Sequence, residues 1–192
     1  SSIAAAGVLN TKVGGPSVHP MLPEGMPTPR GGWDKVEDPA DNYRRSVYIF
    51  VRRNTPYPIL KAFDFPDTTM SCGRRMPTVT APQALSLIND RVTLDWAEKF
   101  AGRVIESAGL DPNRQIETAY RIAYSRAPNG AEKDTIHTFF EKQSAIIRDR
   151  VEKGEPVATP PNAPADADKA RLAALVDFCH TLLNSNEFVY KN

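Results

Sequence analysis

The chain has 192 residues, enough for one domain with a hydrophobic core or two small ones. Its 24 Lys and Arg residues nearly balance 23 Asp and Glu residues, and a net charge of +1 argues against a dedicated DNA-binding domain. No apolar run approaches the roughly 20 residues of a membrane-spanning helix. We therefore expect neither a nucleic-acid partner nor a membrane span.

Proline is the compositional outlier, and its distribution divides the chain. Of 17 prolines, 11 lie in residues 1–82. We predict a mainly α single domain over residues 1–192. Residues 1–79 are expected to be irregular and loop-rich, and residues 80–192 helical. The fold class is a helical bundle of four or more helices, packed with the long proline- and arginine-rich irregular N-terminal half.

Residues 1–6 (SSIAAA) resemble the end of a helix, with Gly7 placed to cap it. No start signal precedes them. This pattern predicts that the chain begins inside a helix of a longer parent.

The segment 11–42 contains so many Gly and Pro residues that no regular element is expected. Two interpretations remain open for so long a loop. It is either an ordered surface strap held by Trp33, Val36 and Tyr43, or a binding loop.

The run 44–53 (RRSVYIFVRR) has an apolar, β-branched and aromatic centre. Periodicity cannot separate a strand from a buried helix in so short a run. Residues 54–79 are expected to be irregular again.

Helical signals dominate the second half. Thr80-Ala81-Pro82-Gln83 is a good helix start, and Asn129-Gly130-Ala131-Glu132 is a capping box. The short helix APQALSLI is predicted to stop near Asn89-Asp90, and apolar periodicity predicts further helices over 91–108, 113–126, 130–152 and about 166–183. A proline-rich surface loop is expected over 154–166.

Known catalytic and metal-binding motifs are missing from the sequence. It contains no phosphate-binding glycine loop, no G-x-S-x-G, no H-E-x-x-H and no C-x-x-C-H. His19, His137 and His180 lie on unrelated segments, so no metal site is predicted. Cys179 is interpreted as a small buried hydrophobe. Cys72 is interpreted as a tucked loop residue or, beside two arginines, a more reactive thiol.

Three arginine pairs within 32 residues form the most marked constellation: Arg44/Arg45, Arg52/Arg53 and Arg74/Arg75. Asp64, Asp67 and Asp90 are interleaved with them. In a structural interpretation, the arginines tie loops to carboxylates and backbone carbonyls. In a functional one, some of them face a cleft and hold an anionic ligand or an acidic partner surface. Asp64 and Asp67 could also serve as an acid/base pair.

At these residues the chain resembles a known family. The runs YRRSVYIFVRRNTPYP and FDFPDTTMSCGRRMPTVTAPQALSLIND, and the ending HTLLNSNEFVY, are similar in order and content to the bacterial domain of unknown function numbered 1553, prominent in planctomycetes. The matching positions are Arg44, Arg45, Ser46, Tyr48, Asp64, Pro66, Asp67, Cys72, Arg74, Arg75, Thr80, Gln83, Ala84, Leu85, Asn89 and Asp90.

The resemblance implies the C-terminal portion of a domain that often accompanies cytochrome c-like modules. It therefore implies export, to the periplasm or beyond, and makes the upstream part of the parent chain and a cytochrome c module the expected partners. No cofactor is expected in this chain, and haem would sit only on an associated module. The family often occurs together with sulfatase-like and carbohydrate-active proteins, which also suggests a role in polysaccharide use.

We therefore predict an uncharacterised structural or binding module that holds an anionic polysaccharide. The expected ligand-binding residues are Arg44, Arg45, Asp64, Asp67, Arg74, Arg75, Gln83 and Asn89, and no catalytic residue is assigned. One alternative is a carbohydrate-active oxidoreductase or hydrolase that uses Asp64, Asp67 and the arginine cluster. Another is a structural domain that docks the upstream module through exposed apolar surface.

Overall fold

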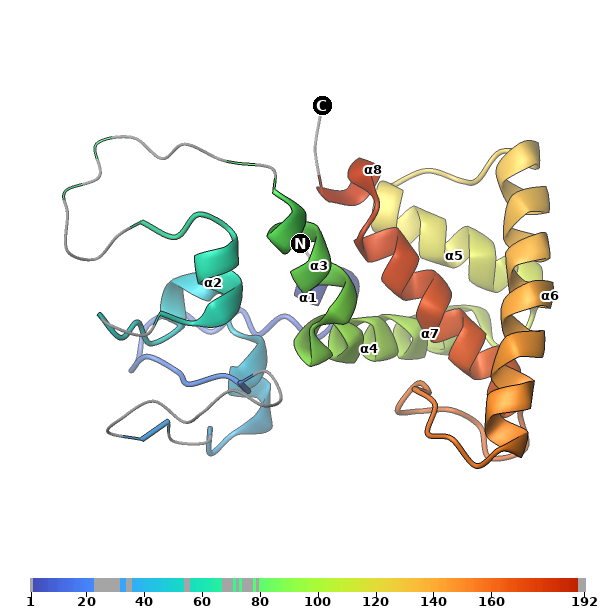
Figure 1. The fold of residues 1–192 in the computed structure, drawn as a ribbon, viewed down its shortest axis with the longest axis horizontal. Helices are drawn as coiled ribbons and strands as arrows, with labels where there is room; N and C mark the ends of the chain where they lie inside the picture. Colours follow the sequence, from blue (N-terminus) through green and yellow to red (C-terminus); the bar gives the residue numbers. More distant parts are fainter. Residues whose placement is uncertain are drawn as a thin grey trace. The chain divides into compact units, whose positions relative to one another are not determined.

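The computed structural model describes residues 2–22, 32–33, 36–53, 56–66, 71, 73, 78 and 80–189. The described part of the chain is mainly helical and contains no strand, which confirms the predicted fold class (Figure 1). In chain order the elements are α1 (Ser2–Ala5), the 3₁₀ turns η1 (Pro39–Tyr43) and η2 (Ser46–Tyr48), α2 (Pro58–Ala62), α3 (Ala81–Asn89), α4 (Arg91–Ala108), α5 (Pro112–Tyr124), α6 (Gly130–Glu152), α7 (Lys169–Leu183) and α8 (Asn186–Val189).

The chain divides into two compact units. One joins Ser1–Gly7 to Leu94–Asn192 and is called the helical unit below; the other is Val8–Thr93, called the irregular unit. The division falls in the first turn of α4, beyond the residue 79/80 boundary suggested by proline content.

Local capping explains why the long helices begin where the sequence predicts. The Asn129 side chain accepts a hydrogen bond from Glu132 N at 2.9 Å, and the Glu132 carboxylate accepts one from Asn129 N at 2.7 Å. At the start of α7, the Asp168 side chain accepts a hydrogen bond from Ala170 N at 2.9 Å. Helix α5 ends earlier than predicted, because Ser125 adopts a left-handed conformation with φ 59°.

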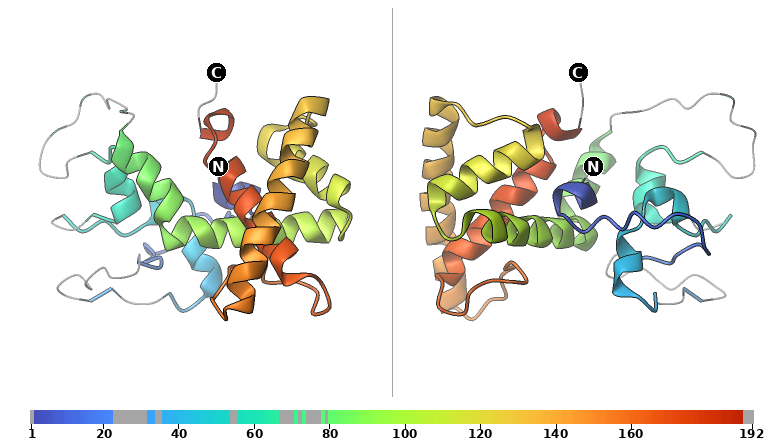
Figure 2. Two further views of the ribbon diagram at one scale, coloured as in Figure 1. Left: turned by 45° about the vertical axis from the view of Figure 1, so that its right-hand side comes forward. Right: turned by 180° about the vertical axis from the view of Figure 1, so that it is seen from behind.

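Helix α7 is the centre of the helical unit. It packs against α5, α6 and α8, and α6 lies beside it in Figures 1 and 2. The sequence pattern predicts that α7 buries one apolar face. The buried surface is wider than one face, since ten of the fifteen residues of α7 are buried. Small residues account for the difference: Ala170, Ala173 and Ala174 let neighbouring elements approach the remaining sides.

Aromatic rings join three helices of this core. Phe178 of α7 is 4% exposed. Its ring centroid lies 5.2 Å from that of Phe140, 6.2 Å from Phe139 and 6.4 Å from Tyr120. Helices α5, α6 and α7 therefore share one hydrophobic contact region.

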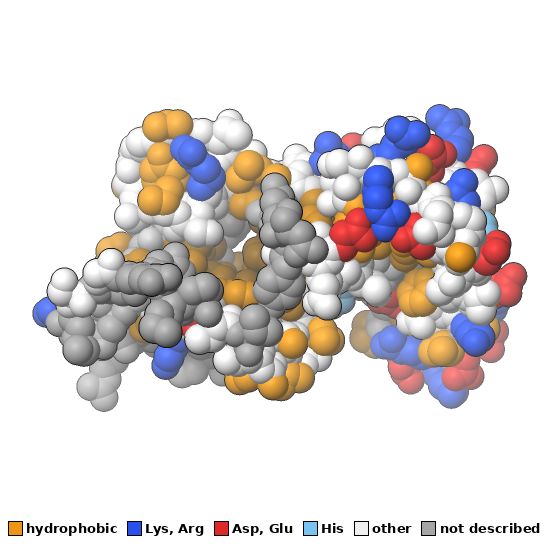
Figure 3. Space-filling model, turned by 90° about the horizontal axis from the view of Figure 1, so that it is seen from above, with side chains coloured by type: hydrophobic (Ala, Val, Ile, Leu, Met, Phe, Trp, Pro, Cys, Tyr) orange, Lys and Arg blue, Asp and Glu red, His pale blue; other side chains and the backbone are white. Residues whose placement is uncertain are grey.

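An ion-pair network connects the start of α6 to α8. The Arg126 guanidinium donates to Glu132 Oε1 at 2.7 Å and to Glu187 Oε1 at 2.7 Å. It also lies 5.4 Å from the ring centroid of Tyr120. On the face of the helical unit seen in Figure 3, Lys and Arg side chains are interspersed with Asp and Glu.

The Arg126 network should make the helical unit less stable in acid. Hydrogen bonding from Arg126 lowers the pKa of Glu132 from 4.5 to about 2. A carboxyl whose pKa is lower in the folded state stabilises that state above its unfolded pKa. We expect this contribution to be lost between pH 4.5 and about 2. Urea unfolding at several pH values tests this: Arg126→Gln should flatten the acid decline, whereas Arg114→Gln on exposed α5 surface should leave it unchanged.

The chain start follows the predicted pattern of a capped helix end. Helix α1 spans Ser2–Ala5, and Gly7 follows with φ 77°. Arg103 of α4 donates to the carbonyl oxygens of Ala4 at 3.1 Å and Ala5 at 2.9 Å. These bonds satisfy carbonyl groups at the helix end.

The prediction that residues 44–53 form a strand or a buried helix is wrong. The run contains the 3₁₀ turn Ser46–Tyr48 and isolated bridges, among them Asn10 to Arg44 and Val18 to Ile49. Val47 at its centre is 79% exposed. The run pairs with the segment around Val18 by single bonds, from Val18 N to Tyr48 O and from Phe50 N to Val18 O, both 2.8 Å. In the described residues, these isolated backbone hydrogen bonds stand in place of the continuous hydrogen-bond ladder of a β-sheet.

Two short helices, α2 and α8, were not predicted from the sequence. Helix α2 lies inside the supposedly irregular segment 54–79, where Pro58 occupies its first position. Helix α8 begins after two intervening residues beyond the end of α7, where the sequence predicted no helix. Helix α3 begins and ends as expected and contacts α2.

Candidate functional site

The eight predicted ligand-binding residues all belong to the irregular unit. Asp67, Arg74 and Arg75 lie outside the described residues, as does Cys72. The other five fall at separate places: Arg44 and Arg45 flank the Ser46–Tyr48 turn, while Asp64, Gln83 and Asn89 belong to the α2–α3 region.

Arg44 is buried and bonded to backbone. It is 4% exposed, and its guanidinium donates to the carbonyl oxygens of Lys12 (3.2 Å), Gly14 (2.6 Å) and Pro16 (3.1 Å). The guanidinium carbon lies 3.8 Å from the ring centroid of Tyr48. Arg44 therefore organises the turn over residues 12–16, as the structural interpretation of the arginine pairs expects.

Tyr48 completes the support of the same turn. Gly14 N donates to the Tyr48 hydroxyl oxygen at 3.0 Å, and this bond is the main cause of a lowered Tyr48 pKa. Gly14 and Gly15 have φ values of 77° and 82°, which non-glycine residues rarely adopt. The turn is therefore fixed by glycine conformation and by two side chains from one distant segment.

Arg45 has a different environment from its neighbour. Its side chain is exposed, and its guanidinium carbon lies 5.6 Å from the Tyr48 ring centroid. An exposed guanidinium can form paired hydrogen bonds to a carboxylate or sulfate. The adjacent pair thus contains one buried and one accessible cation.

Asp64 and Gln83 are brought together by Thr78. Asp64 Oδ2 accepts from Thr78 N at 2.6 Å, and Oδ1 accepts from the Thr78 hydroxyl at 2.8 Å. Gln83 Nε2 donates to Thr78 Oγ1 at 3.1 Å and to Asp64 Oδ2 at 3.4 Å. Gln83 is 6% exposed, and its Oε1 accepts from Thr80 N at 3.2 Å as part of the α3 capping box.

This cluster connects the chain after α2 to the start of α3. Asp64 has φ 56°, a conformation that Asp tolerates better than most residues. Both of its carboxylate oxygens accept hydrogen bonds from Thr78, so their geometry is that of a structural anchor. Asn89, the last residue of α3, is exposed.

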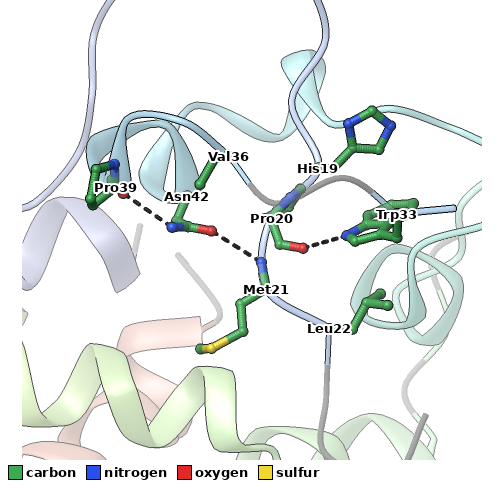
Figure 4. Close-up of a pocket in the computed structure, with 8 residues that line it drawn as sticks. All are labelled: His19, Pro20, Met21, Leu22, Trp33, Val36, Pro39 and Asn42. Atoms are coloured by element: carbon green, nitrogen blue, oxygen red, sulfur yellow. Dashed lines mark hydrogen bonds between the residues drawn. The ribbon is translucent and has the colours of Figure 1, made fainter. Parts of the chain in front are cut away.

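The structure places a pocket in the proline-rich segment 11–42, for which the sequence left a surface strap and a binding loop open. A cavity of about 400 Å³ is lined by His19, Pro20, Met21, Leu22, Trp33, Val36, Pro39 and Asn42 (Figure 4). We call it the Trp33 pocket. Its signal in the sequence was a tryptophan among prolines, which equally suits a strap held by an aromatic anchor.

Trp33 is held in place from several sides. Its indole Nε1 donates to Pro20 O at 2.7 Å. Its ring stacks on Tyr57 with a centroid distance of 6.0 Å and an interplanar angle of 8°. The His19 ring meets it edge-on at 4.9 Å. The indole is therefore a pre-positioned wall of the pocket.

Tyr57 fixes the backbone under the pocket. It is 4% exposed, its hydroxyl donates to Met21 O at 2.7 Å, and burial raises its pKa. Asn42 bonds to the same backbone segment from the other side, because its Oδ1 accepts from Met21 N at 3.1 Å. Its Nδ2 donates to Pro39 O at 3.2 Å, which fixes the orientation of the amide. Figure 4 shows Asn42 and Trp33 approaching the Pro20–Met21 backbone from opposite sides.

The pocket is suited to binding rather than to a recognisable reaction. Its lining combines apolar and aromatic side chains with a few polar groups, the composition typical of small-molecule sites. Among the described residues no group of three His, Cys, Asp or Glu side chains has a metal-binding arrangement. His137 lies on α6 and His180 on α7, in the helical unit, whereas His19 lines the pocket.

Cys179 lies in the core of the helical unit. It is a fully buried free thiol, and burial raises its pKa. This environment confirms the interpretation as a small hydrophobe. None of the helices built from described residues is long and apolar enough to cross a bilayer.

Comparisons with known proteins identify a family and nothing narrower. No curated protein and no solved structure matches the chain. One family model, described as PSD1, protein of unknown function (DUF1553), matches residues 1–140. This range includes the arginine pairs, the Asp64 cluster and the Trp33 pocket. It also includes all of α4 and α5 and the first part of α6. Because the match covers well over half of the chain, this protein belongs to the DUF1553 family.

Proposed function

We propose that this chain is a binding module and that the Trp33 pocket holds one sugar unit of an acidic polysaccharide. The observation that carries the proposal is the pre-positioned indole wall of a cavity of about 400 Å³. That volume lies within the range of small-ligand sites, roughly 300–1,000 Å³.

A sugar ring matches the chemistry of this lining. A pyranose has an apolar face of C–H groups and a rim of hydroxyls. The indole of Trp33 offers a flat apolar surface, and Leu22 and Val36 extend the apolar lining. His19 adds a polar ring that can exchange hydrogen bonds with a hydroxyl.

Arg45 supports a preference for acidic sugars. It follows the pocket residue Asn42 by three positions and is exposed, whereas Arg44 is occupied by backbone carbonyls. A carboxylate or sulfate on the sugar chain would give Arg45 a bidentate partner. The predicted anionic ligand is thus retained, with Arg44 reassigned to support of the turn.

Calorimetric titration of the chain tests the proposal. Acidic oligosaccharides (uronate or sulfated) should bind more tightly than neutral ones of the same length. Trp33→Ala should weaken both by about 20-fold or more, because a buried aromatic anchor typically contributes about 2 kcal/mol. Arg45→Gln should weaken only the acidic ligands, and Arg114→Gln on α5 should weaken neither.

Two results would contradict the proposal. One is the lack of heat with every oligosaccharide while the protein remains folded. The other is equal binding by Trp33→Ala and the unmodified chain. Loss of acid preference alone would leave the pocket assignment and remove Arg45 from it.

Resemblance to the family motifs supports a context for this module. We infer an exported multidomain bacterial protein in which the module accompanies a cytochrome c-type module and contacts the upstream part of the parent chain. Exposed apolar side chains of the irregular unit, among them Val47, Leu85 and Ile88, are suited to such a contact.

The enzymatic alternative relies on Asp64 as an acid or base. We expect Asp64→Asn to lower the free energy of unfolding by about 1–2 kcal/mol. The two carboxylate oxygens of Asp64 accept from Thr78 N and from the Thr78 hydroxyl, whereas an amide has only one oxygen that can accept. Urea unfolding and sugar titration of this variant separate the roles. A structural anchor predicts lower stability with sugar binding intact. Turnover of an oligosaccharide that disappears in a fully stable Asp64→Asn protein would favour the enzyme.

A further inference from the structure

Two accessible hydrogen-bond donors, Arg45 and Tyr48, lie together at the surface of the irregular unit, at the 3₁₀ turn Ser46–Tyr48. Arg45 is exposed, and the hydroxyl of the partly exposed Tyr48 lies at the surface. The Arg45 guanidinium carbon is 5.6 Å from the centroid of the Tyr48 ring. Arg45 forms no ion pair with a carboxylate of the described residues. A molecule in solution can therefore reach both groups.

The Tyr48 hydroxyl has a proton to donate. Its oxygen accepts a hydrogen bond from Gly14 N at 3.0 Å, and no described residue accepts from its O–H. A phenol can donate one hydrogen bond while its oxygen accepts another. The bond from Gly14 therefore holds the oxygen in place and leaves the proton for an external acceptor.

Positive charge surrounds this hydroxyl. The hydrogen bond from Gly14 N is the largest cause of the lowered Tyr48 pKa; partial burial acts in the opposite direction, and the charges of Arg45 and Arg44 lower the pKa further. The Arg44 guanidinium lies 3.8 Å from the ring centroid, but its Nη atoms donate to backbone carbonyls. Arg44 thus adds charge only, whereas Arg45 adds charge together with accessible donors. This setting favours an anion over a neutral acceptor.

We propose that Arg45 and Tyr48 together bind one oxyanion, a carboxylate or a sulfate, through the guanidinium and the phenol O–H. We call this pair the Tyr48 clamp. One oxygen of the anion accepts from the Tyr48 hydroxyl, and another accepts from Arg45. The ligand therefore needs at least two acceptor oxygens on one centre, which carboxylate and sulfate have, whereas chloride is a single atom.

The clamp lies close along the chain to the Trp33 pocket. Phe50 follows Tyr48 by two positions, and its ring centroid is 4.8 Å from that of the pocket residue His19. Ile49 between them is extended, so positions 48 and 50 are separated by roughly 7 Å. A sugar chain seated at Trp33 can place the acidic group of a neighbouring unit at the clamp. That source of the anion rests on the proposed function, whereas binding of a free oxyanion does not.

NMR of the full chain with tyrosine labelled at Cζ tests the clamp. Sodium sulfate and sodium acetate should each shift the Tyr48 signal saturably, with a Kd on the order of 10 mM, and sodium chloride at equal ionic strength should not. Arg45→Gln should weaken both anions at least about fivefold, the effect expected for loss of a charged hydrogen bond. Arg114→Gln, the same charge change on α5, should have no effect.

Calorimetry with oligosaccharides separates the clamp from the pocket. Tyr48→Phe should weaken acidic oligosaccharides at least about fivefold and leave neutral ones unchanged, because the ring stays and the O–H is lost. Tyr124→Phe, the same change in the helical unit, should alter neither. If no oligosaccharide binds while sulfate still shifts Tyr48, the proposed function fails and the clamp stands.

Three results would overturn the clamp. The first is the lack of a saturable Tyr48 shift with sulfate and acetate, or an equal shift with chloride. The second is unchanged anion binding by Arg45→Gln. The third is equal weakening of neutral and acidic oligosaccharides by Tyr48→Phe, which would assign Tyr48 to support of the turn over residues 12–16 alone.

Discussion

Replacing Phe178 by alanine should lower the free energy of unfolding of the helical unit by about 3–5 kcal/mol, the usual cost of removing a buried aromatic ring. The ring is 4% exposed and lies next to Phe139 and Phe140 of α6 and Tyr120 of α5. A smaller side chain leaves a cavity bounded by three helices, and the stacked and tilted ring contacts disappear with it. Urea unfolding followed by circular dichroism measures the change.

A matched control is available on the neighbouring helix. Ile146 of α6 is 56% exposed, so Ile146→Ala should change the free energy of unfolding by no more than about 0.5 kcal/mol. A loss below about 1 kcal/mol for Phe178→Ala would contradict the shared contact region of α5, α6 and α7.

Arg44→Met should cost the irregular unit about 3 kcal/mol, because three carbonyl groups lose a charged donor while the apolar length of the side chain is kept. The carbonyls belong to Lys12, Gly14 and Pro16. Hydrogen exchange measured by mass spectrometry should show faster exchange of the amides of Val18 and Phe50, which bond across the adjacent segments.

The neighbouring residue gives the comparison for this variant. Arg45→Met makes the same chemical change at an exposed side chain, so exchange at the Val18 and Phe50 amides should remain as in the unmodified chain. Equal acceleration by both variants would show that Arg44 is not the support of the turn over residues 12–16.

The helical half could be predicted because its signals are local. A cap such as Asn129 and its partner Glu132 lie three residues apart, and an apolar period covers only a few turns. The burial of α7 on most sides could not be predicted, since it depends on which other helices surround the small residues Ala173 and Ala174.

The irregular unit was predicted less well, because its contacts are distant in the sequence. Nothing near Arg44 indicates that its acceptors lie in residues 12–16. The run 44–53 has strand-like composition, yet in the described part of the chain it forms isolated bridges and no continuous strand. Composition reports what a segment can form, and tertiary pairing decides what it does form.

The candidate site shows the same division between local and distant information. Asp64 and Gln83 were predicted as ligand-binding residues, and the structure shows them hydrogen-bonded to each other and to Thr78 at the start of α3. The sequence left a strap and a binding loop open for segment 11–42, and it did not indicate that Tyr57, in another segment, positions the Trp33 indole. Trp33 thus both packs against Tyr57 and forms a wall of the pocket.

The most direct test of the proposed function observes the Trp33 ring itself. Trp96→Phe leaves Trp33 as the single tryptophan of the chain. Titration of this variant with an acidic oligosaccharide should give a saturable change in tryptophan emission, with the same affinity as calorimetry, because the sugar covers the indole. Calorimetric binding with unchanged Trp33 emission would place the sugar elsewhere and contradict the Trp33 pocket as the recognition site.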